Sequence, residues 1–250
     1  MTPVSNWDEV WAVRRLDASR GTLLEQLLAA DGFDTGFGSV TAQAWAAAVH
    51  RRAHELAIGP GTSVFEVGCG AGAFLYELRA LGCAVGGIDS SPALIEIARR
   101  ALPDGGFDVC DAARLAREPA ADFVVSSGVF LYFPSLAYAR GVIDAMVSKA
   151  ARAVAILDVP DLSTREAAIA ERHAAVGGEA VYRERYAGLD HLYYDRGWVR
   201  HALQGAGLTA VTIVDQDIPG YANGRYRFNA WGFVPPWDNP AAAAHTATGG

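Results

Sequence analysis

The chain has 250 residues, 51% of them hydrophobic, and carries a formal net charge of −7 at neutral pH. This length suffices for one α/β domain with additions and leaves little for two separate domains. Nucleic acids and anionic membranes attract basic surfaces, so the acidic balance argues against either partner. No apolar run approaches the ~18 residues of a membrane span, and no transmembrane segment is expected.

The cysteines and the N-terminal residues indicate in which cellular compartment the protein is expected. Cys69, Cys83 and Cys110 are odd in number and lack paired metal spacing. We therefore expect neither a disulfide framework nor a metal site, and interpret them as small buried residues in a reducing compartment. Residues 1–10 show no basic region followed by an apolar core, so no signal peptide is expected. These features favour the cytoplasm; the oligomeric state stays open.

The N-terminal part, 1–40, is expected to be helical. Trp7, Val10, Trp11 and Arg14 recur at helical spacing. Two interpretations remain open: the tryptophans dock a helix onto the domain, or the helix covers a ligand as a lid.

The organising stretch is an apolar run, a glycine turn and the start of a helix. A buried strand is expected over 63–67, followed by Gly-x-Gly-x-Gly and a helix over 72–81. Glycine lets the backbone approach a ligand closely, and the first amides of a helix have no internal partners. Such a turn indicates a nucleotide-like ligand, although glycine spacing alone is weak evidence.

The residue two positions before the first glycine helps to decide which ligand. Glu66 at the strand end would be a poor neighbour for a pyrophosphate and suits a ligand with a cationic sulfonium and an α-amino group. The stretch resembles motif I of the class I S-adenosylmethionine-dependent methyltransferases. The resemblance extends through Asp89, Asp111 and Ser127, about half of the chain. It implies S-adenosylmethionine as the cofactor, held by Glu66, Gly68, Cys69, Gly70, Gly72, Asp89, Ser90, Asp111, Ala112 and Ser127.

Two carboxylates follow at the ends of the next strands. Asp89 ends a turn and strand over 82–89, where an acidic residue can accept hydrogen bonds from both ribose hydroxyls. The alternative is a helix N-cap, but Ser90 or Ser91 can take that role before the helix over 93–101. Asp111 ends a strand over 106–110; it could accept from the adenine amino group, with Ala112 supplying an amide, or cap the next turn.

A fourth buried strand over 121–126 ends in Ser127 and an aromatic stretch through Tyr132 and Phe133. This resembles the methyltransferase motif that faces donor and acceptor together. The Asn or Asp followed by Pro-Pro, which is typical of enzymes acting on DNA bases or amide nitrogen, is absent. Tyr132 is a candidate catalytic residue; simple packing is its alternative.

After a helix over 136–149 and a strand over 153–157, the regular alternation stops. We interpret 159–195 as a substrate-cap insert, because a polar helix over 164–175 is followed by a stretch dense in tyrosine, arginine and histidine. If the acceptor needs a general base, His191 is the first candidate and His173 the second, since histidine titrates near neutral pH. For His191, hydrogen bonding within the cap is the alternative. Candidate substrate-binding residues are Tyr186, Tyr193, Arg227 and Trp11.

Arginines can bind a substrate carboxylate through paired hydrogen bonds. Arg183 and Arg185 in the insert and Arg225 and Arg227 near the last strand are candidates, with ordinary surface ion pairs as the alternative.

The chain end completes the fold expectation. A helix over 195–206 precedes strands over 209–214 and 226–233, which indicate a hairpin. We therefore expect a Rossmann-like α/β three-layer sandwich whose seven-stranded sheet is mostly parallel, with one antiparallel strand near the C-terminus. One methyltransferase domain over 1–237 and a disordered tail over 238–250 are expected.

The resulting hypothesis is an S-adenosylmethionine-dependent methyltransferase that acts on a small molecule. The insert is similar to those of methyltransferases of secondary metabolism, which is an argument by analogy. Alternatives are an NAD(P)-dependent oxidoreductase of Rossmann type and a non-catalytic S-adenosylmethionine-binding protein.

Overall fold

The seven strands form one sheet in the order β3-β2-β1-β4-β5-β7-β6. The computed structural model describes residues 6–34 and 38–237, so the tail expected over 238–250 lies outside the described residues. β7 runs antiparallel to both β5 and β6, whereas the pairs among β1 to β5 are parallel. The predicted sheet, with one antiparallel strand near the C-terminus, is confirmed. The strands are β1 (Ser63–Val67), β2 (Ala84–Asp89), β3 (Gly106–Val109), β4 (Ala121–Ser127), β5 (Ala150–Pro160), β6 (Thr209–Asp215) and β7 (Arg227–Phe233).

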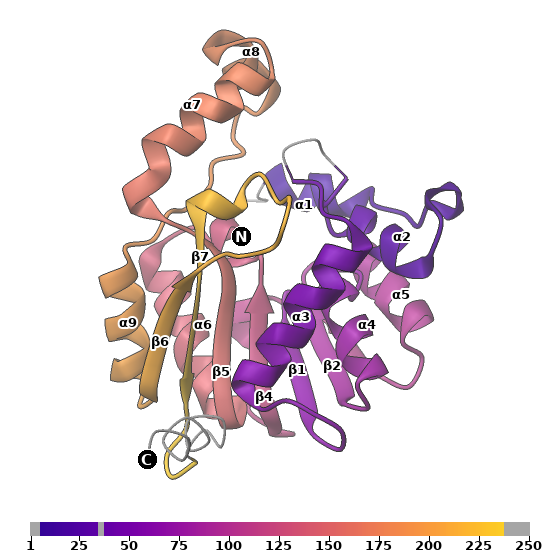
Figure 1. The fold of residues 1–250 in the computed structure, drawn as a ribbon, viewed down its shortest axis with the longest axis vertical. Helices are drawn as coiled ribbons and strands as arrows, with labels where there is room; N and C mark the ends of the chain where they lie inside the picture. Colours follow the sequence, from indigo (N-terminus) through magenta and orange to yellow (C-terminus); the bar gives the residue numbers. More distant parts are fainter. Residues whose placement is uncertain (1–5, 35–37, 238–250) are drawn as a thin grey trace, which may run out of the picture.

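Helices cover both faces of the sheet and make the fold three-layered (Figure 1). On one face lie α3 (Ala42–Leu56), α4 (Ala73–Ala80) and α5 (Pro92–Ala101). On the other lie α6 (Leu136–Lys149) and α9 (Arg196–Gly205). The sequence produces these two layers because successive side chains of a strand point to opposite faces of the sheet and the central strands are apolar on both faces.

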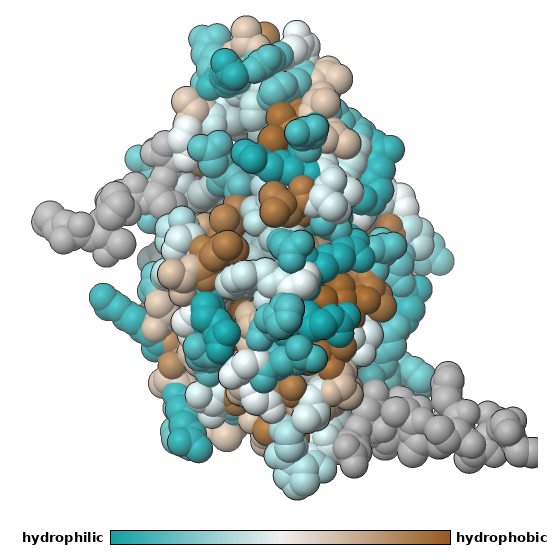
Figure 2. All heavy atoms as spheres, turned by 90° about the vertical axis from the view of Figure 1, so that its left-hand side faces the viewer, coloured by the Kyte–Doolittle hydropathy of each residue, from teal (hydrophilic) through white to brown (hydrophobic). Residues whose placement is uncertain are grey.

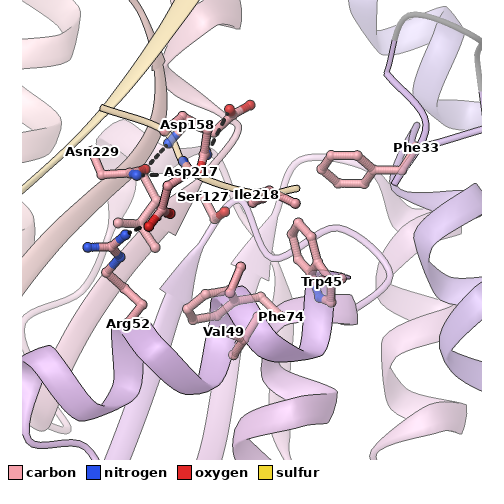
Figure 3. Close-up of a pocket in the computed structure, with 13 residues that line it drawn as sticks. Phe33, Trp45, Val49, Arg52, Phe74, Ser127, Asp158, Asp217, Ile218 and Asn229 are labelled. Atoms are coloured by element: carbon pink, nitrogen blue, oxygen red, sulfur yellow. Dashed lines mark hydrogen bonds and ion pairs between the residues drawn. The ribbon is translucent and has the colours of Figure 1, made fainter. Parts of the chain in front are cut away.

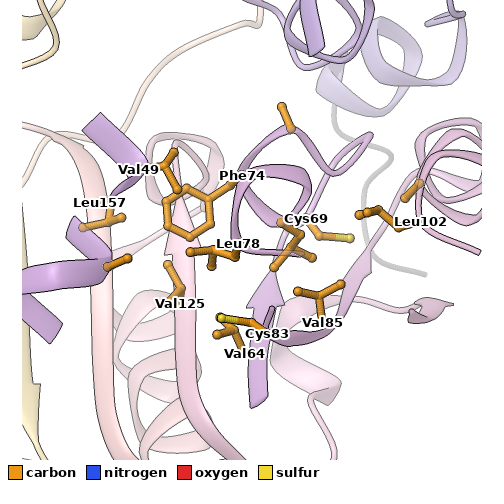
Figure 4. Close-up of a cluster of buried hydrophobic side chains, with 14 of the residues drawn as sticks. Val49, Val64, Cys69, Phe74, Leu78, Cys83, Val85, Leu102, Val125 and Leu157 are labelled. Atoms are coloured by element: carbon orange, nitrogen blue, oxygen red, sulfur yellow. The ribbon is translucent and has the colours of Figure 1, made fainter. Parts of the chain in front are cut away.

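Two hydrophobic cores result from this alternation. Val64 of β1 and Val125 of β4 pack with Leu78 of α4 in the first core (Figure 4). Val67 and Val124, whose side chains lie on the other face, belong to the second core. Burial of one such side chain contributes roughly 1.5–3 kcal/mol, so the two cores fix the strand ends that carry the site.

Two elements differ from the sequence prediction. β5 continues beyond Leu157 to Pro160, and the register against β7 shifts between Ile156 and Val159. Within this irregularity Asp158 adopts a left-handed backbone conformation, with φ of 58°. The prediction ended the strand too early because a polar residue followed by proline usually marks a strand end. The short helix α8 (Glu179–Arg185) was not predicted.

Segments at the carboxyl edge of the sheet complete the molecule. α1 (Asn6–Ala12) packs against α5, and α2 (Leu23–Ala30) begins with a capping box formed by Thr22 and Glu25. α7 (Arg165–Ala175) and α8 extend as a pair away from the sheet (Figure 1). On the face carrying this pair, small hydrophobic areas are separated by hydrophilic residues (Figure 2). Among the described residues, none of the helices is long and apolar enough to cross a membrane.

Candidate active site

The turn after β1 requires glycine for steric reasons at two positions. Gly68 and Gly70 have φ of 73° and 53°, in the left-handed region that favours glycine. A Cβ at Gly68 would lie 2.4 Å from a methyl group of Val129, in the turn after β4. A Cβ at Gly70 would lie 2.2 Å from a carboxylate oxygen of Asp31. The turn is therefore packed closely between the end of β4 and the segment after α2.

Asp31, which the sequence analysis missed, caps α4 from outside that helix. Its carboxylate accepts hydrogen bonds from the backbone amides of Ala71 and Ala73, the latter at 3.1 Å. Gly72 at the N-cap position has no side chain to do so. Burial, opposed by these two hydrogen bonds, raises the pKa of Asp31 to about 7. A lone aspartate after a helix gives no sequence signal for this role.

Three carboxyl groups, those of Asp31, Glu66 and Asp89, form what we call the acid cluster. Burial is the main cause that raises the pKa of Glu66 well above its usual range, and the other two carboxyls add to it. Glu66 is 3% exposed, and its Oε2 atom has no hydrogen-bond partner among the described residues. Like charges held this close favour either protonation or a cationic ligand.

Asp89 ends β2 beside the glycine turn. Its carboxylate accepts from the amides of Gly70 at 2.9 Å and Ser91 at 2.8 Å. Burial raises its pKa, and these two bonds oppose that effect. Ser91, not Asp89, is the N-cap of α5, and its hydroxyl accepts from the Leu94 amide. Ser90 is exposed at the same edge.

Asp111 lies beyond β3, at the N-cap of the turn η2 (Ala112–Arg114). Its Oδ1 accepts from the amide of Ala113 and from the hydroxyl of Tyr138, both at 2.8 Å. The capping alternative is therefore realised by one oxygen. In the part of the chain that the structure describes, no hydrogen bond uses the other oxygen, and the side chain is exposed.

The three cysteines were all expected to be buried. Cys69 and Cys83 are buried, but Cys110 is only partly so, because it lies at the exposed end of β3.

These residues fit a cationic adenosyl ligand. The acid cluster includes a buried oxygen that has no partner within residues 6–34 and 38–237, and a sulfonium or ammonium group would compensate it. The exposed Asp111 lies at the carboxyl end of the sheet two strands from the glycine turn, on the side where α/β folds bind ligands. Ser127 ends β4 on the opposite side of that turn.

A second group gathers beyond the ends of β4 and β5. We call Tyr132, Arg172, His191, Tyr193 and Arg227 the acceptor-side cluster. Two hydrogen bonds join the segment that carries His191 and Tyr193 to the turn η3 (Phe130–Tyr132). The amide of Leu192 donates to the carbonyl of Leu131, and the hydroxyl of Tyr194 donates to the carbonyl of Phe130. The structure thus brings together four candidates from three parts of the sequence, together with Arg172, which the sequence analysis missed.

His191 is held on both sides. Its ring stacks on Trp7 with centroids 5.2 Å apart, and Arg172 donates to its Nδ1 at 2.5 Å. A guanidinium can only donate, so this contact places the ring proton on Nε2. Burial, then Arg172 and Arg227, hold the pKa of His191 well below its usual range, so the ring is neutral.

The ring of Tyr132 contacts α1 as well as His191. Its centroid lies 4.6 Å from that of Trp7, 5.5 Å from Trp11 and 5.8 Å from His191. Burial raises the pKa of Tyr132 to about 12, so its phenol is a hydrogen-bond donor at neutral pH. The backbone carbonyl of Trp11 meanwhile accepts from the Ser91 hydroxyl at 3.2 Å. α1 therefore touches both the acid-cluster side and the acceptor side.

Arg227 and Asp158 form a buried pair, with Nη1 and Oδ2 3.7 Å apart. Asp158 also accepts from the Tyr221 hydroxyl at 2.9 Å and from Gln216 at 3.0 Å, and its amide donates to Asn229. Arg227 donates to the Asp158 carbonyl at 3.1 Å. A surface ion pair was one interpretation of Arg227 from the sequence, but its side chain is only 4% exposed.

A small pocket adjoins this network on the α3 side (Figure 3). Phe33, Trp45 and Phe74 form its aromatic wall, and Ser127 and Asp158 bring it to the ends of β4 and β5.

His173 and Tyr186 lie in a different environment. Both rings pack on Tyr182 of α8, with centroid distances of 4.9 and 4.8 Å. They belong to the helix pair that extends from the body, and no ring contact joins them to His191 or Tyr132 among the described residues.

The sheet order, the glycine turn and the acid cluster define the class I methyltransferase fold. The family of methyltransferase domains matches residues 38–213, and the chain belongs to this family. It is an S-adenosylmethionine-dependent methyltransferase, and S-adenosylmethionine is its cofactor.

Solved structures show the same fold. The magnesium protoporphyrin IX methyltransferase of Synechocystis, with bound S-adenosylhomocysteine, superposes with a TM-score of 0.56 at 16% identity over 91% of this chain and 92% of that one. The N-methyltransferase NodS of Bradyrhizobium japonicum, also with bound S-adenosylhomocysteine, gives 0.58 at 18% identity over 85% and 96%. A curated relative, trans-aconitate 2-methyltransferase of Methylobacterium nodulans, is 36% identical over 73 residues, 28% of either chain.

Proposed function

We propose that this methyltransferase modifies a small molecule bound at the acceptor-side cluster. One observation carries the proposal: Tyr132, His191, Tyr193 and Arg227 converge beyond the ends of β4 and β5, and Ser127 is the last residue of β4. Aromatic walls with a few polar groups are typical of small-molecule sites. Apart from the arginines already named, the cluster offers no broad basic surface of the kind that a nucleic acid needs.

The cofactor contacts are proposed residue by residue. Asp89 would accept from the ribose hydroxyls and Asp111, through its free oxygen, from the adenine amino group, with Ala112 beside it. Glu66 and the turn from Gly68 through Cys69, Gly70 and Gly72 would bind the methionine part, with Ser127 across from them. Ser90 lies exposed beside Asp89 and would contact the ribose edge.

Two flanking segments would enclose the reactants. Residues 1–40 act in this proposal as a helical lid, because α1 contacts Ser91 through Trp11 and His191 through Trp7. Residues 159–195 act as the substrate cap, which supplies His191 and Tyr193. The more distant Tyr186 and His173 would contact an acceptor only where it reaches α8.

The bound cofactor supplies a methyl group that is already activated for transfer. The protein then contributes alignment and exclusion of water. Tyr132 would orient the acceptor as a hydrogen-bond donor. For His191 to act as a general base, its Nδ1 would have to exchange the bond from Arg172, since its other nitrogen carries the proton.

The test separates three functions. Isothermal titration with S-adenosylmethionine and with NAD should show binding of S-adenosylmethionine alone. A panel of small acceptors should then release S-adenosylhomocysteine. Cofactor binding without turnover on any acceptor would favour a non-catalytic binding protein, and methylation of only nucleic acid or protein would refute the small-molecule proposal.

A further inference from the structure

Arg172 is a cation without a carboxylate partner on the acceptor side. In the described part of the chain, its guanidinium donates a hydrogen bond to the neutral ring of His191. Within residues 6–34 and 38–237, no carboxylate lies within ion-pair distance of its guanidinium. The neighbouring Glu171 is occupied by Arg225 and the hydroxyl of Tyr226. A guanidinium has five donor hydrogens, so most of those on Arg172 remain available for a ligand.

The charge balance of the cluster is positive. Arg172 and Arg227 face the same pair of rings, those of Tyr132 and His191. Asp158 is the carboxylate that pairs with Arg227, so the two arginines of the cluster face one carboxylate. His191 does not change this balance because it is neutral.

Tyr193 adds an unused donor at the same place. Its hydroxyl oxygen is buried and has no hydrogen-bond partner among the described residues. Tyr193 is one of the groups that raise the pKa of Arg227. The guanidinium of Arg165 lies 5.7 Å from the centroid of the Tyr193 ring. A buried hydroxyl without a partner costs free energy, and an anionic acceptor would remove that cost.

The cluster has no base ready to take a proton. The Nδ1 of His191 accepts from Arg172, and Tyr132 is a protonated phenol. The Tyr221 hydroxyl donates to Asp158, whose oxygens also serve Gln216 and Arg227. Among the described residues, a hydroxyl or protonated amine would therefore meet only bases that already accept a hydrogen bond, the Nδ1 of His191 and the oxygens of Asp158, whereas a carboxylate acceptor needs no base.

We infer that the acceptor is a carboxylic acid, held by Arg172 and Tyr193 and methylated on a carboxylate oxygen; this inference rests on the proposed function. A lone pair of that oxygen forms the new O–CH₃ bond while the S–CH₃ bond breaks and its electron pair stays on sulfur. The carboxylate becomes a neutral methyl ester and the sulfonium a neutral thioether. No proton moves, so the reaction is balanced without a base.

Binding is tested first, with S-adenosylhomocysteine present. Benzoate, phenylacetate and cinnamate are compared with their primary amides by isothermal titration. We expect each acid to bind more tightly than its amide. In Arg172→Gln the affinity for the acids should fall about 10- to 100-fold, as expected for loss of a charge-assisted hydrogen bond. Affinity for S-adenosylhomocysteine and for the amides should stay unchanged. If Arg172 had only a structural role, its loss would weaken the binding of acids and amides alike.

Arg183→Gln is the matched control. Arg183, a carboxylate-binding candidate from the sequence, instead lies exposed on the same insert, pairs with Glu179 within α8 and is not a member of the acceptor-side cluster. Its replacement should leave every affinity unchanged. Tyr193→Phe should weaken acid binding less than Arg172→Gln, because one neutral hydrogen bond is lost.

The product and the pH profile complete the test. Methyl-labelled S-adenosylmethionine with the tightest-binding acid should give a base-labile product that releases labelled methanol. At saturating cofactor, turnover should be flat between about pH 6.5 and 8.5, since no acceptor proton is removed.

Failure of the two proposals gives different results. If S-adenosylmethionine does not bind, or nothing small is methylated, the proposed function fails. If the cofactor binds but the acids bind no better than their amides, or a base-stable ether or amine forms, the carboxylate inference alone is overturned. Unchanged acid affinity in Arg172→Gln would overturn it as well.

Discussion

The cofactor side and the acceptor side of the site bury opposite kinds of ionisable group, carboxyls on the first and guanidinium groups on the second. Around the glycine turn lie the three carboxyl groups of the acid cluster, and the Oε2 atom of Glu66 has no hydrogen-bond partner among the described residues. Beyond β4 and β5, Arg172 and Arg227 outnumber Asp158. The two sets lie at the same edge of the sheet, with Glu66 on β1 and Asp89 on β2, and with Asp158 on β5 and Arg227 on β7. A cationic donor and an anionic acceptor would each meet the charge that stabilises it, and would be drawn toward one another.

The two sides also differ in how they are built. The cofactor side rests on backbone geometry: positive φ angles, helix amides and a close approach of Val129. The acceptor side rests on long side chains from η3, α7, the segment after α8, and β7. Backbone geometry is constrained by few residues, whereas side-chain clusters can change without altering the fold. The comparison therefore predicts that mutations on the two sides separate stability, cofactor binding and acceptor binding.

The largest effect is expected at the buried pair of the acceptor side. Asp158→Asn keeps the size and the left-handed backbone, which asparagine tolerates, but leaves Arg227 without its counter-charge. We expect the free energy of unfolding to fall by about 3 kcal/mol. Urea unfolding measures this. Asp144→Asn, which breaks the exposed ion pair with Arg140, should change the free energy of unfolding by less than about 0.5 kcal/mol. Equal losses of stability in the two variants would contradict the special importance of the buried Asp158–Arg227 pair.

The next effect tests the backbone of the cofactor side. Gly70→Ala adds a methyl group at a positive φ and against Asp31. We expect a loss of about 2 kcal/mol in stability and at least a tenfold loss of S-adenosylmethionine affinity. The measurements are urea unfolding and isothermal titration.

Gly61→Ala provides the control for strain alone. Gly61 has φ of 80°, and a Cβ there would meet nothing within 4 Å. This variant should lose about 1 kcal/mol of stability from backbone strain and keep its cofactor affinity. A comparable loss of affinity in both variants would show that the contact with Asp31 is unimportant.

The third prediction uses pH to test the acid cluster. The pKa of Asp31 is raised to about 7, so the folded protein keeps this proton between about pH 4 and 7 while the unfolded chain releases it. Its contribution to the free energy of unfolding is therefore largest at low pH and is lost as pH rises to about 7. A cationic cofactor favours the ionised form, so S-adenosylmethionine affinity should rise, about tenfold, through the same range.

Asp31→Asn should remove this step and leave the affinity nearly flat near pH 7. The groups facing Asp31 are Glu66, Asp89 and Arg14, together with the amides of Ala71 and Ala73. Glu66→Gln is the control, because it should keep the step that belongs to Asp31. Persistence of the step in Asp31→Asn would assign it to another member of the acid cluster.

The sequence predicted the sheet and the cofactor side because both depend on local pattern. The apolar runs, the glycine turn and the strand ends at Asp89 and Asp111 are contiguous signals, and the predicted β1 and α6 match the structure in every residue. Asp31 could not be found in this way, because it contacts a helix some forty residues later in the chain.

The acceptor side was predicted less completely for the same reason. His191 and Tyr193 stood out by composition, but Arg172 lies in a polar helix that looks like any exposed helix. Arg227 was the one of four candidate arginines that the sequence also named for substrate binding, but only the fold shows that it is buried beside Asp158. The environments of these four arginines depend on long-range packing, which no local sequence pattern encodes.

The smallest predicted effect is also the most specific to the acceptor side. Tyr193→Phe removes a buried hydroxyl that has no partner among the described residues, so stability should stay the same or rise slightly. In the proposed reaction the same change should raise the KM for the acceptor about fivefold, because one hydrogen bond to the ligand is lost. The Kd for S-adenosylmethionine should not change, which steady-state kinetics and isothermal titration check together. Tyr226→Phe, which removes a hydroxyl bound to Glu171, is the control and should leave KM unchanged. If Tyr193→Phe instead destabilises the protein and leaves KM unaltered, its hydroxyl serves the fold and not the acceptor.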